Sequence, residues 1–264
     1  MTSVDQTRYE IKGSAAWITL SSPATRNALS VTMIAEFGGH LCSAMDDPAV
    51  RVIVVTGEGP AFCAGADLKN RGNMGEGAHG SQHPLVGILK LLREGPKPVV
   101  CAVNGHAVGG GVGLIAACDI AIAVAGAKFS FSEVRLGLIP AMISIVVLPR
   151  LGEHQTMRLF LTGERFSAEE AREYGLLHRV VPDGRLDAAV QGEIDQILRG
   201  GPIAIREAKR LVRIVAALPE QEAFAFAQDK FATLAASEEA EEGMAAFLEK
   251  RPAAWVSRSS DEEK

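Results

Sequence analysis

The groups best placed to do chemistry in this chain are main-chain amides rather than side chains. Residues 104–119 read NGHAVGGGVGLIAACD. A glycine inside a helix costs roughly 0.5–1 kcal/mol relative to alanine, so this run needs a reason. If a helix begins near Gly109, its first N–H groups lack an intrahelical partner and carry the positive end of the helix dipole. Such bare amides could stabilise an oxyanion on a carbonyl group. Close packing of the helix on a strand explains the glycines equally well.

A second set of bare amides is predicted in the stretch FCAGADL at residues 62–68, which follows a predicted strand at 52–55. Two loops that leave separate strands could bring their amides to one carbonyl oxygen, and this favours the oxyanion interpretation. Dinucleotide binding is the other interpretation, because Gly111-x-Gly113-x-x-Ala116 fits the pattern G-x-G-x-x-G/A. It is not favoured, since seven residues separate the predicted strand at 99–103 from Gly111, whereas the fingerprint lies directly in the strand-to-helix turn.

Glu133 is the candidate for moving a proton. It lies in the stretch FSFSEVRLG at 129–137 and is the only acidic residue between Asp119 and Glu153. Its apolar neighbours predict partial burial, which would raise the pKa of the carboxyl group toward neutrality and suit it for acid/base catalysis. The simpler alternative is a Glu133–Arg135 ion pair on one face of a strand, worth about 0–1 kcal/mol if exposed.

The elements that position these residues alternate between strands and helices. Short apolar runs rich in β-branched residues predict buried strands, and the segments between them have helical periodicity. This alternation indicates an α/β fold. The predicted strands are 17–20, 52–55, 99–103 and 120–124, and the predicted helices among them are 31–46, 84–94 and 109–118.

After about residue 150 the pattern becomes helical. The sequence Gly200-Gly201-Pro202 predicts a boundary between a core of residues 1–200 and an all-helical C-terminal region of residues 201–264. The predicted helices in this part of the chain are 153–162, 167–175, 186–199, 203–216, 219–236 and 238–250.

The composition predicts a soluble, cytoplasmic protein. The 264 residues are 47% hydrophobic and 22% charged, with a net charge of -5 and no basic run, which argues against a nucleic-acid partner. The four cysteines are widely spaced, as expected of reduced thiols. No signal peptide is expected. The uncharged stretch from Val99 to Cys118 is interrupted by Asn104, His106 and glycines, so it predicts a buried strand and helix rather than a membrane span.

The sequence FCAGADL, followed about forty residues later by NGxAxGGG, resembles the crotonase superfamily, also called the enoyl-CoA hydratase/isomerase family. The resemblance extends over nearly the whole chain, and includes RNAL at 26–29, ACDI at 117–120, LTG at 161–163 and EGMxxFxEKR at 242–251. It implies a spiral of repeated ββα units with a helical C-terminal region. It also implies an acyl-CoA substrate, no cofactor beyond that coenzyme A, no metal, no membrane partner, and assembly into homotrimers or homohexamers.

The resemblance also assigns roles to individual residues. The amides of Ala66 and Gly110 would form the oxyanion hole for the thioester carbonyl, and Glu133 would act as acid and base. Phe231 and Lys250 would reach the coenzyme A bound by a neighbouring subunit. The remaining substrate-binding positions are Arg26, Ala28, Leu29, Ala64, Asp67, Leu68 and Gly109.

Two departures from the family pattern bear on the reaction. Hydratases of this family typically use two glutamates, and Gly113 stands where the first would be. Single-glutamate members include isomerases as well as hydratases and hydratase-lyases that act on branched or aromatic acyl groups. The segment IPAMISIVVL at 139–148 replaces glycines and polar residues of IPGAGGTQRL with apolar ones, so we expect a reshaped acyl pocket. SEVRLGLIPA more weakly resembles methylglutaconyl-type hydratases. The alternatives are hydratase, isomerase or a non-catalytic acyl-CoA-binding protein.

Other polar residues are weaker candidates. His79 and His83 are four residues apart, but their glycine-rich segment need not be helical, so no metal pair is expected. His106 is more simply explained as a hydrogen-bonded structural histidine. Ser132 and Ser144 could support a water molecule near Glu133.

Overall fold

Two β-sheets form the core of the molecule in a computed structural model that describes residues 5–69 and 83–256. The first sheet has β1 antiparallel to β2 and its other strands parallel, and the second has only its β8–β9 pair antiparallel. In sheet order, the first contains β1 (Thr7–Lys12), β2 (Ala15–Leu20), β3 (Val52–Gly57), β5 (Val99–Val103), β7 (Ile120–Val124) and β10 (Arg179–Val181). The second contains β4 (Ala61–Cys63), β6 (His106–Val108), β8 (Lys128–Ser130) and β9 (Arg165–Ser167).

The chain repeats a ββα unit as it moves across both sheets. β3, β4 and α2 (Pro84–Glu94) form one unit, β5, β6 and α3 (Gly110–Ala117) the next, and β7, β8 and α4 (Ala141–Thr162) a third. Because each long strand is followed by a short strand of the second sheet, the loops before the helices gather at one end of the core. The predicted α/β spiral is therefore confirmed.

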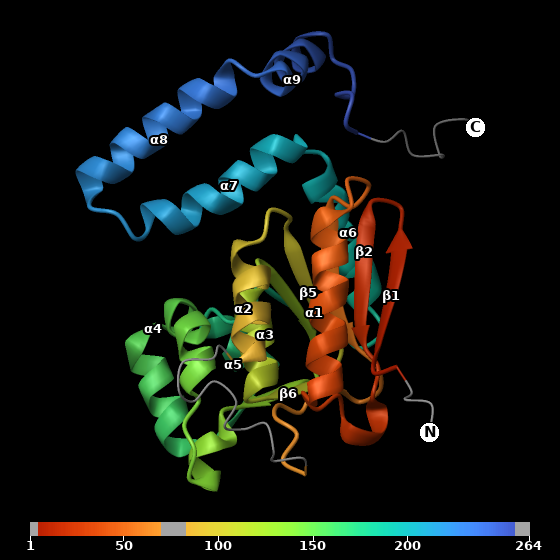
Figure 1. The fold of residues 1–264 in the computed structure, drawn as a ribbon, viewed down its shortest axis with the longest axis vertical. Coiled ribbons are helices and arrows are strands. Elements are labelled where there is room, and N and C mark those ends of the chain that lie inside the picture. The colour runs from red at the N-terminus through yellow and green to blue at the C-terminus, as the bar shows by residue number, and fades with distance from the viewer. Residues whose placement is uncertain (1–4, 70–82, 257–264) are drawn as a thin grey trace.

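The central strands of the first sheet, β3, β5 and β7, are buried on both faces, which explains their unbroken apolar runs. Along β5, Val99, Cys101 and Val103 pack into a cluster with α1 (Val31–Asp46), α2 and α3. Val100 and Ala102 point to the opposite face, where α6 (Leu186–Leu198) covers them. Figure 1 shows α1 and α2 side by side in front of this sheet.

Some element predictions were incomplete. β1 and the three-residue strands were missed, because β1 is an exposed edge strand and three residues are too short to show a period. The helix predicted at 153–162 is the second half of α4, in which Gly152 has φ 69° and interrupts the helical backbone. α5 (Ala168–Glu173) starts with a capping box formed by Ser167 and Glu170.

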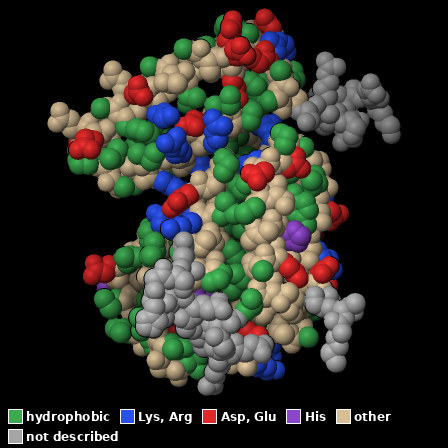
Figure 2. Space-filling model, viewed as in Figure 1, with side chains coloured by type: hydrophobic (Ala, Val, Ile, Leu, Met, Phe, Trp, Pro, Cys, Tyr) green, Lys and Arg blue, Asp and Glu red, His purple; other side chains and the backbone are tan. Residues whose placement is uncertain are grey.

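The C-terminal helices project from one end of the core (Figure 1). The turn at 200–201, where the sequence predicts a boundary, lies between α6 and α7 (Pro202–Val215). Neither α7 nor α8 (Glu220–Ala235) has a buried residue, and α9 (Glu238–Leu248) buries only Ala246. Figure 2 shows a hollow between these helices and the rest of the molecule. Among the described residues, no helix is both long and apolar enough to cross a lipid bilayer.

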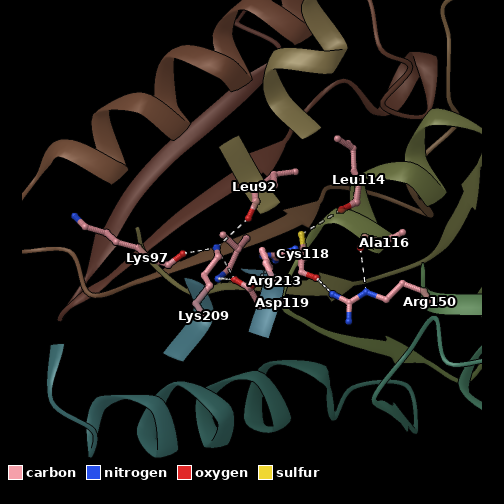
Figure 3. Close-up of polar contacts among 10 residues, drawn as sticks. Leu92, Lys97, Leu114, Ala116, Cys118, Asp119, Arg150, Lys209 and Arg213 are labelled. Atoms are coloured by element: carbon pink, nitrogen blue, oxygen red, sulfur yellow. Dashed lines mark hydrogen bonds and ion pairs between the residues drawn. The ribbon is translucent and has the colours of Figure 1, made fainter. Parts of the chain in front are cut away.

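A carboxylate at the start of β7 ties α7 to the core (Figure 3). Asp119 lies 2.7 Å from Nζ of Lys209 and 2.8 Å from Nη2 of Arg213, both on α7. Lys209 also donates to the carbonyl oxygens of Leu92 and Lys97, at 3.0 and 2.8 Å. α7 is therefore held against the core by partly buried ionic contacts, although none of its residues is fully buried.

Replacement of Asp119 by asparagine is expected to lower the free energy of unfolding by roughly 1.5–3 kcal/mol, because Lys209 and Arg213 would lose a charged hydrogen-bond acceptor. The Lys209 side chain is only 8% exposed, so water cannot substitute for that acceptor. Urea denaturation followed by circular dichroism measures the loss. Glu169→Gln is the matched control, since its ion pair with Arg172 is exposed and worth about 0–1 kcal/mol. Equal stabilities of the two variants would contradict the expectation.

Candidate active site

A cavity of about 1010 Å³ lies between α1, α2, the start of α3 and the loops that follow β4 and β6. Its walls are mostly apolar, with a few polar groups, as is usual for small-molecule sites. The structure brings eight of the predicted site residues to this cavity: Leu29, Ala64, Ala66, Asp67, Leu68, Gly109, Gly110 and Glu133.

The other four predicted site residues do not line the cavity. Arg26 and Ala28 lie just before Leu29, and the carbonyl oxygen of Arg26 accepts a hydrogen bond of 3.0 Å from the amide of Ala64. Phe231, on α8, is 76% exposed, and Lys250 follows α9 with φ 55°. The role predicted for Phe231 and Lys250 involves a neighbouring subunit, and the structure of a single chain does not test it.

Two loops that line the cavity contain amides with no acceptor among the described residues. The amide of Leu29 donates to the carbonyl of Gly65 at 2.7 Å, and the amide of Gly109 donates to Ser130 at 2.9 Å, which fixes both loops. In the described part of the chain, the amides of Ala66 and Gly110 donate to no protein acceptor. The loops are in contact, since a methyl group placed on Gly65 would lie 3.5 Å from the nitrogen of Gly110. The two free donors thus lie close to each other in one cavity.

The glycine run allows close approach at four positions. A methyl group added to Gly109 would lie 2.8 Å from Oε1 of Glu133. One added to Gly110 would lie 2.8 Å from Cδ1 of Leu29, and one added to Gly111 would lie 2.8 Å from Cβ of Cys63. At Gly113 it would lie 2.8 Å from Cβ of Ile143 and closer still to its Cγ2 atom. Packing therefore accounts for Gly111 and Gly113, whereas Gly110 also offers an open amide.

Glu133 occupies a 3-10 helix, Ser132–Leu136, and not a strand. Its carboxyl group lies against Gly109, whose φ of 52° favours glycine. Burial raises the pKa of Glu133, and its buried Oε2 atom has no hydrogen-bond partner in the described part of the chain. The predicted partial burial is confirmed. The alternative ion pair is wrong, because the guanidinium of Arg135 donates to the carbonyl of Thr162 at 3.2 Å instead.

The minor candidates have mostly structural contacts. Nδ1 of His106 accepts a hydrogen bond from the amide of Lys128, and Nδ1 of His83 accepts one from Leu85 at the start of α2. His79 lies outside the described residues. Ser132 lines the cavity, whereas Ser144 does not and donates to the carbonyl of Ala141. Within residues 5–69 and 83–256, no three potential metal ligands cluster.

Sequence reasoning missed the side chain that lies opposite Gly113. Ile143 is 3% exposed, lines the cavity and fills the space that a larger residue at 113 would need. The signal was present, because Gly113 and the apolar segment 139–148 both depart from the family pattern. These departures mark both positions as unusual, but only the structure shows that the two are in contact.

The spiral of ββα units, with a cavity at the loops and a helical C-terminal region, defines a crotonase-fold protein. Over residues 10–258 the chain matches the model of the enoyl-CoA hydratase/isomerase family, and it belongs to that family, which acts on acyl-CoA thioesters.

Individual relatives cover almost the full length of the chain. It is 34% identical over 247 residues to the crotonyl-CoA hydratase of Syntrophomonas wolfei, with 90% of this chain and 93% of the relative covered. It is 30% identical over 252 residues to the (E)-benzylidenesuccinyl-CoA hydratase of Thauera aromatica, with 93% and 97% covered. The crystal structure of an enoyl-CoA hydratase from Shewanella pealeana superposes with a TM-score of 0.88 at 33% identity, covering 95% of this chain and 96% of that one.

Proposed function

We propose that this protein is an enoyl-CoA hydratase that holds the thioester carbonyl with the amides of Ala66 and Gly110. The observation that carries the proposal is that two unpaired amides and the unpaired carboxyl oxygen of Glu133 share one cavity. Amides that are already oriented toward a developing negative charge stabilise an enolate without reorganisation.

Glu133 supplies the proton chemistry in this mechanism. As a carboxylate, it takes a proton from a water molecule, whose oxygen forms a bond to the β-carbon while electrons move onto the thioester oxygen. The protonated Glu133 then gives that proton to the α-carbon, and the enolate returns to a thioester. The raised pKa of Glu133 supports both steps, since a catalytic acid/base works best when its pKa is near the working pH.

The coenzyme A portion of the substrate would lie between the loop 64–68 and the segment 26–29. Leu68 and Leu29 offer apolar surface along the cavity, and the exposed Arg26 offers a positive charge for a phosphate group. The mechanism needs no cofactor other than this coenzyme A.

Isomerisation is the second candidate, and the contact between Ile143 and Gly113 favours it. With an apolar side chain in that position, Glu133 is the one carboxyl group of the described cavity lining that lies against α3. A single carboxyl group suffices to move a proton between two carbons of an acyl chain.

A panel of 2-enoyl-CoA and 3-enoyl-CoA thioesters, with products separated by chromatography, tests the proposal. A hydratase forms 3-hydroxyacyl-CoA, whereas an isomerase interconverts the two enoyl thioesters. Calorimetric binding of the thioesters without turnover of any of them would contradict both activities and support a non-catalytic acyl-CoA-binding protein.

We also propose a homotrimer or homohexamer in the cytoplasm. Exposed apolar side chains on the C-terminal helices, including Val212, Phe224 and Phe231, support self-association. All four cysteines are free, which agrees with a reducing compartment. A monomer in light scattering would contradict the assembly and the predicted roles of Phe231 and Lys250.

A further inference from the structure

Two side chains lie in a row along one face of α3. Gly109 and Gly113 are one turn apart, joined by a 3.1 Å hydrogen bond from the amide of Gly113 to the carbonyl of Gly109. Four residues of α-helix advance by about 6 Å. The carboxyl group of Glu133 covers Gly109, and the side chain of Ile143 covers Gly113. Ile143 is therefore the neighbour of the catalytic carboxyl group along this wall of the cavity.

The position of Ile143 is closely fixed. It lies in the first turn of α4, and its side chain is buried against α3. A β-branched side chain on a helix has one strongly preferred rotamer, so Ile143 cannot easily swing away. The cavity wall beside Glu133 is therefore apolar, and the side chain that forms it has little freedom to move.

The cavity is open in another direction, between α1 and α2. Ile34 and Gly38 of α1 line one side of this extension, and Gly87 and Leu91 of α2 line the other. Among the described atoms, a methyl group added to Gly87 would meet none within 4 Å, and one added to Gly38 would meet only Ile88, at 3.9 Å. An unbranched chain has room to run along this groove.

We propose that Ile143 is a specificity-determining residue that selects acyl groups with an unbranched β-carbon. This inference rests on the proposed function, because that function places the α- and β-carbons beside Glu133. A β-carbon with a single apolar substituent directs its chain into the groove between α1 and α2. A second substituent on the same carbon meets Ile143, and a polar one would also lose its hydration without gaining a partner.

Binding of saturated thioesters tests selection without requiring turnover. Wild-type protein and the Ile143→Ala variant are titrated by calorimetry with butanoyl-CoA and 3-methylbutanoyl-CoA. Shortening Ile143 is expected to shift the ratio of the two Kd values about tenfold or more toward the branched thioester. Ile145→Ala is the matched control, since Ile145 lies on the same helix, is 64% exposed and does not line the cavity. It is expected to leave the ratio unchanged.

The kinetic counterpart uses crotonyl-CoA and 3-methylcrotonyl-CoA, whose kcat/KM ratio is expected to shift in the same direction. If Ile143→Ala does not fold, Ile143→Val, which removes one methyl group, is expected to give a smaller shift of the same sign. Binding of both saturated thioesters with an unchanged ratio in the variant would overturn the role of Ile143 and leave the proposed function intact. A shifted binding ratio without turnover of any enoyl thioester would overturn the proposed function and support the selection.

Discussion

Replacement of Glu133 by glutamine is expected to lower kcat by about 10²–10⁴-fold, because the amide can neither take nor return a proton. The substitution keeps the size of the side chain beside Gly109, so KM should change little. Steady-state kinetics on the best thioester of the panel measures the loss. Glu169→Gln, on the exposed surface of α5, is the control and should retain full activity. Unchanged turnover in Glu133→Gln would remove Glu133 from the mechanism.

The pH dependence of catalysis and of stability tests the role of Glu133 independently. Since burial raises the pKa of Glu133, kcat/KM should fall as the pH drops through a value above the ordinary glutamate pKa of about 4.3. The pKa of Glu133 is higher in the folded state than in the unfolded state, so protonation of Glu133 stabilises the fold. This stabilisation is complete below the unfolded-state pKa and is lost as the pH rises through the folded-state pKa. Glu133→Gln should therefore be more stable than the wild type at pH 7, and the difference should shrink in acid. A variant less stable at pH 7 would contradict this.

Replacement of Gly110 by proline is expected to lower kcat by about 10²–10³-fold, the usual effect of deleting one oxyanion donor. Gly110 is the first residue of α3, a position at which proline is compatible with a helix. The substitution therefore removes the N–H group while permitting the helix to form.

Gly110→Ala is the matched control for this experiment. Both variants place a Cβ atom against Cδ1 of Leu29, the end of a flexible side chain, but only alanine keeps the amide. The ratio of kcat between the alanine and proline variants therefore reports the donor itself, provided that thermal unfolding shows both to be folded. Equal kcat values would show that the amide of Gly110 holds no charge in the transition state.

Most of the long elements could be predicted from the sequence, but the contacts between them could not. The strands predicted at 99–103 and 120–124 coincide with β5 and β7, because a buried parallel strand is an uninterrupted apolar run. β4, β6 and β8 have three residues each, too few for a periodic signal, and they were missed. Glu133 was expected in or beside a strand, because the 3-10 helix around it has no clear signal in SEVRL.

The residues of the candidate site could be predicted from the sequence, but the contacts that shape its cavity could not. The glycine pattern and the family resemblance indicated Ala66, Gly110 and Glu133, and the structure places all three in one cavity. What the sequence did not reveal is that Ile143 reaches Gly113, since the two are thirty residues apart and belong to different helices. Such a contact depends on the crossing of α3 and α4, which no local pattern encodes.

The contact between Gly113 and Ile143 also links the two positions during evolution, because a change at one alters the space available at the other. A glutamate acquired first at position 113 would collide with Ile143 in a closed core, and overpacking of this kind costs typically 1–3 kcal/mol or more. Shortening Ile143 first would leave a void that costs about 2–5 kcal/mol but preserves Glu133 and both amides. Either change alone therefore destabilises the fold, so positions 113 on α3 and 143 on α4 are expected to change together.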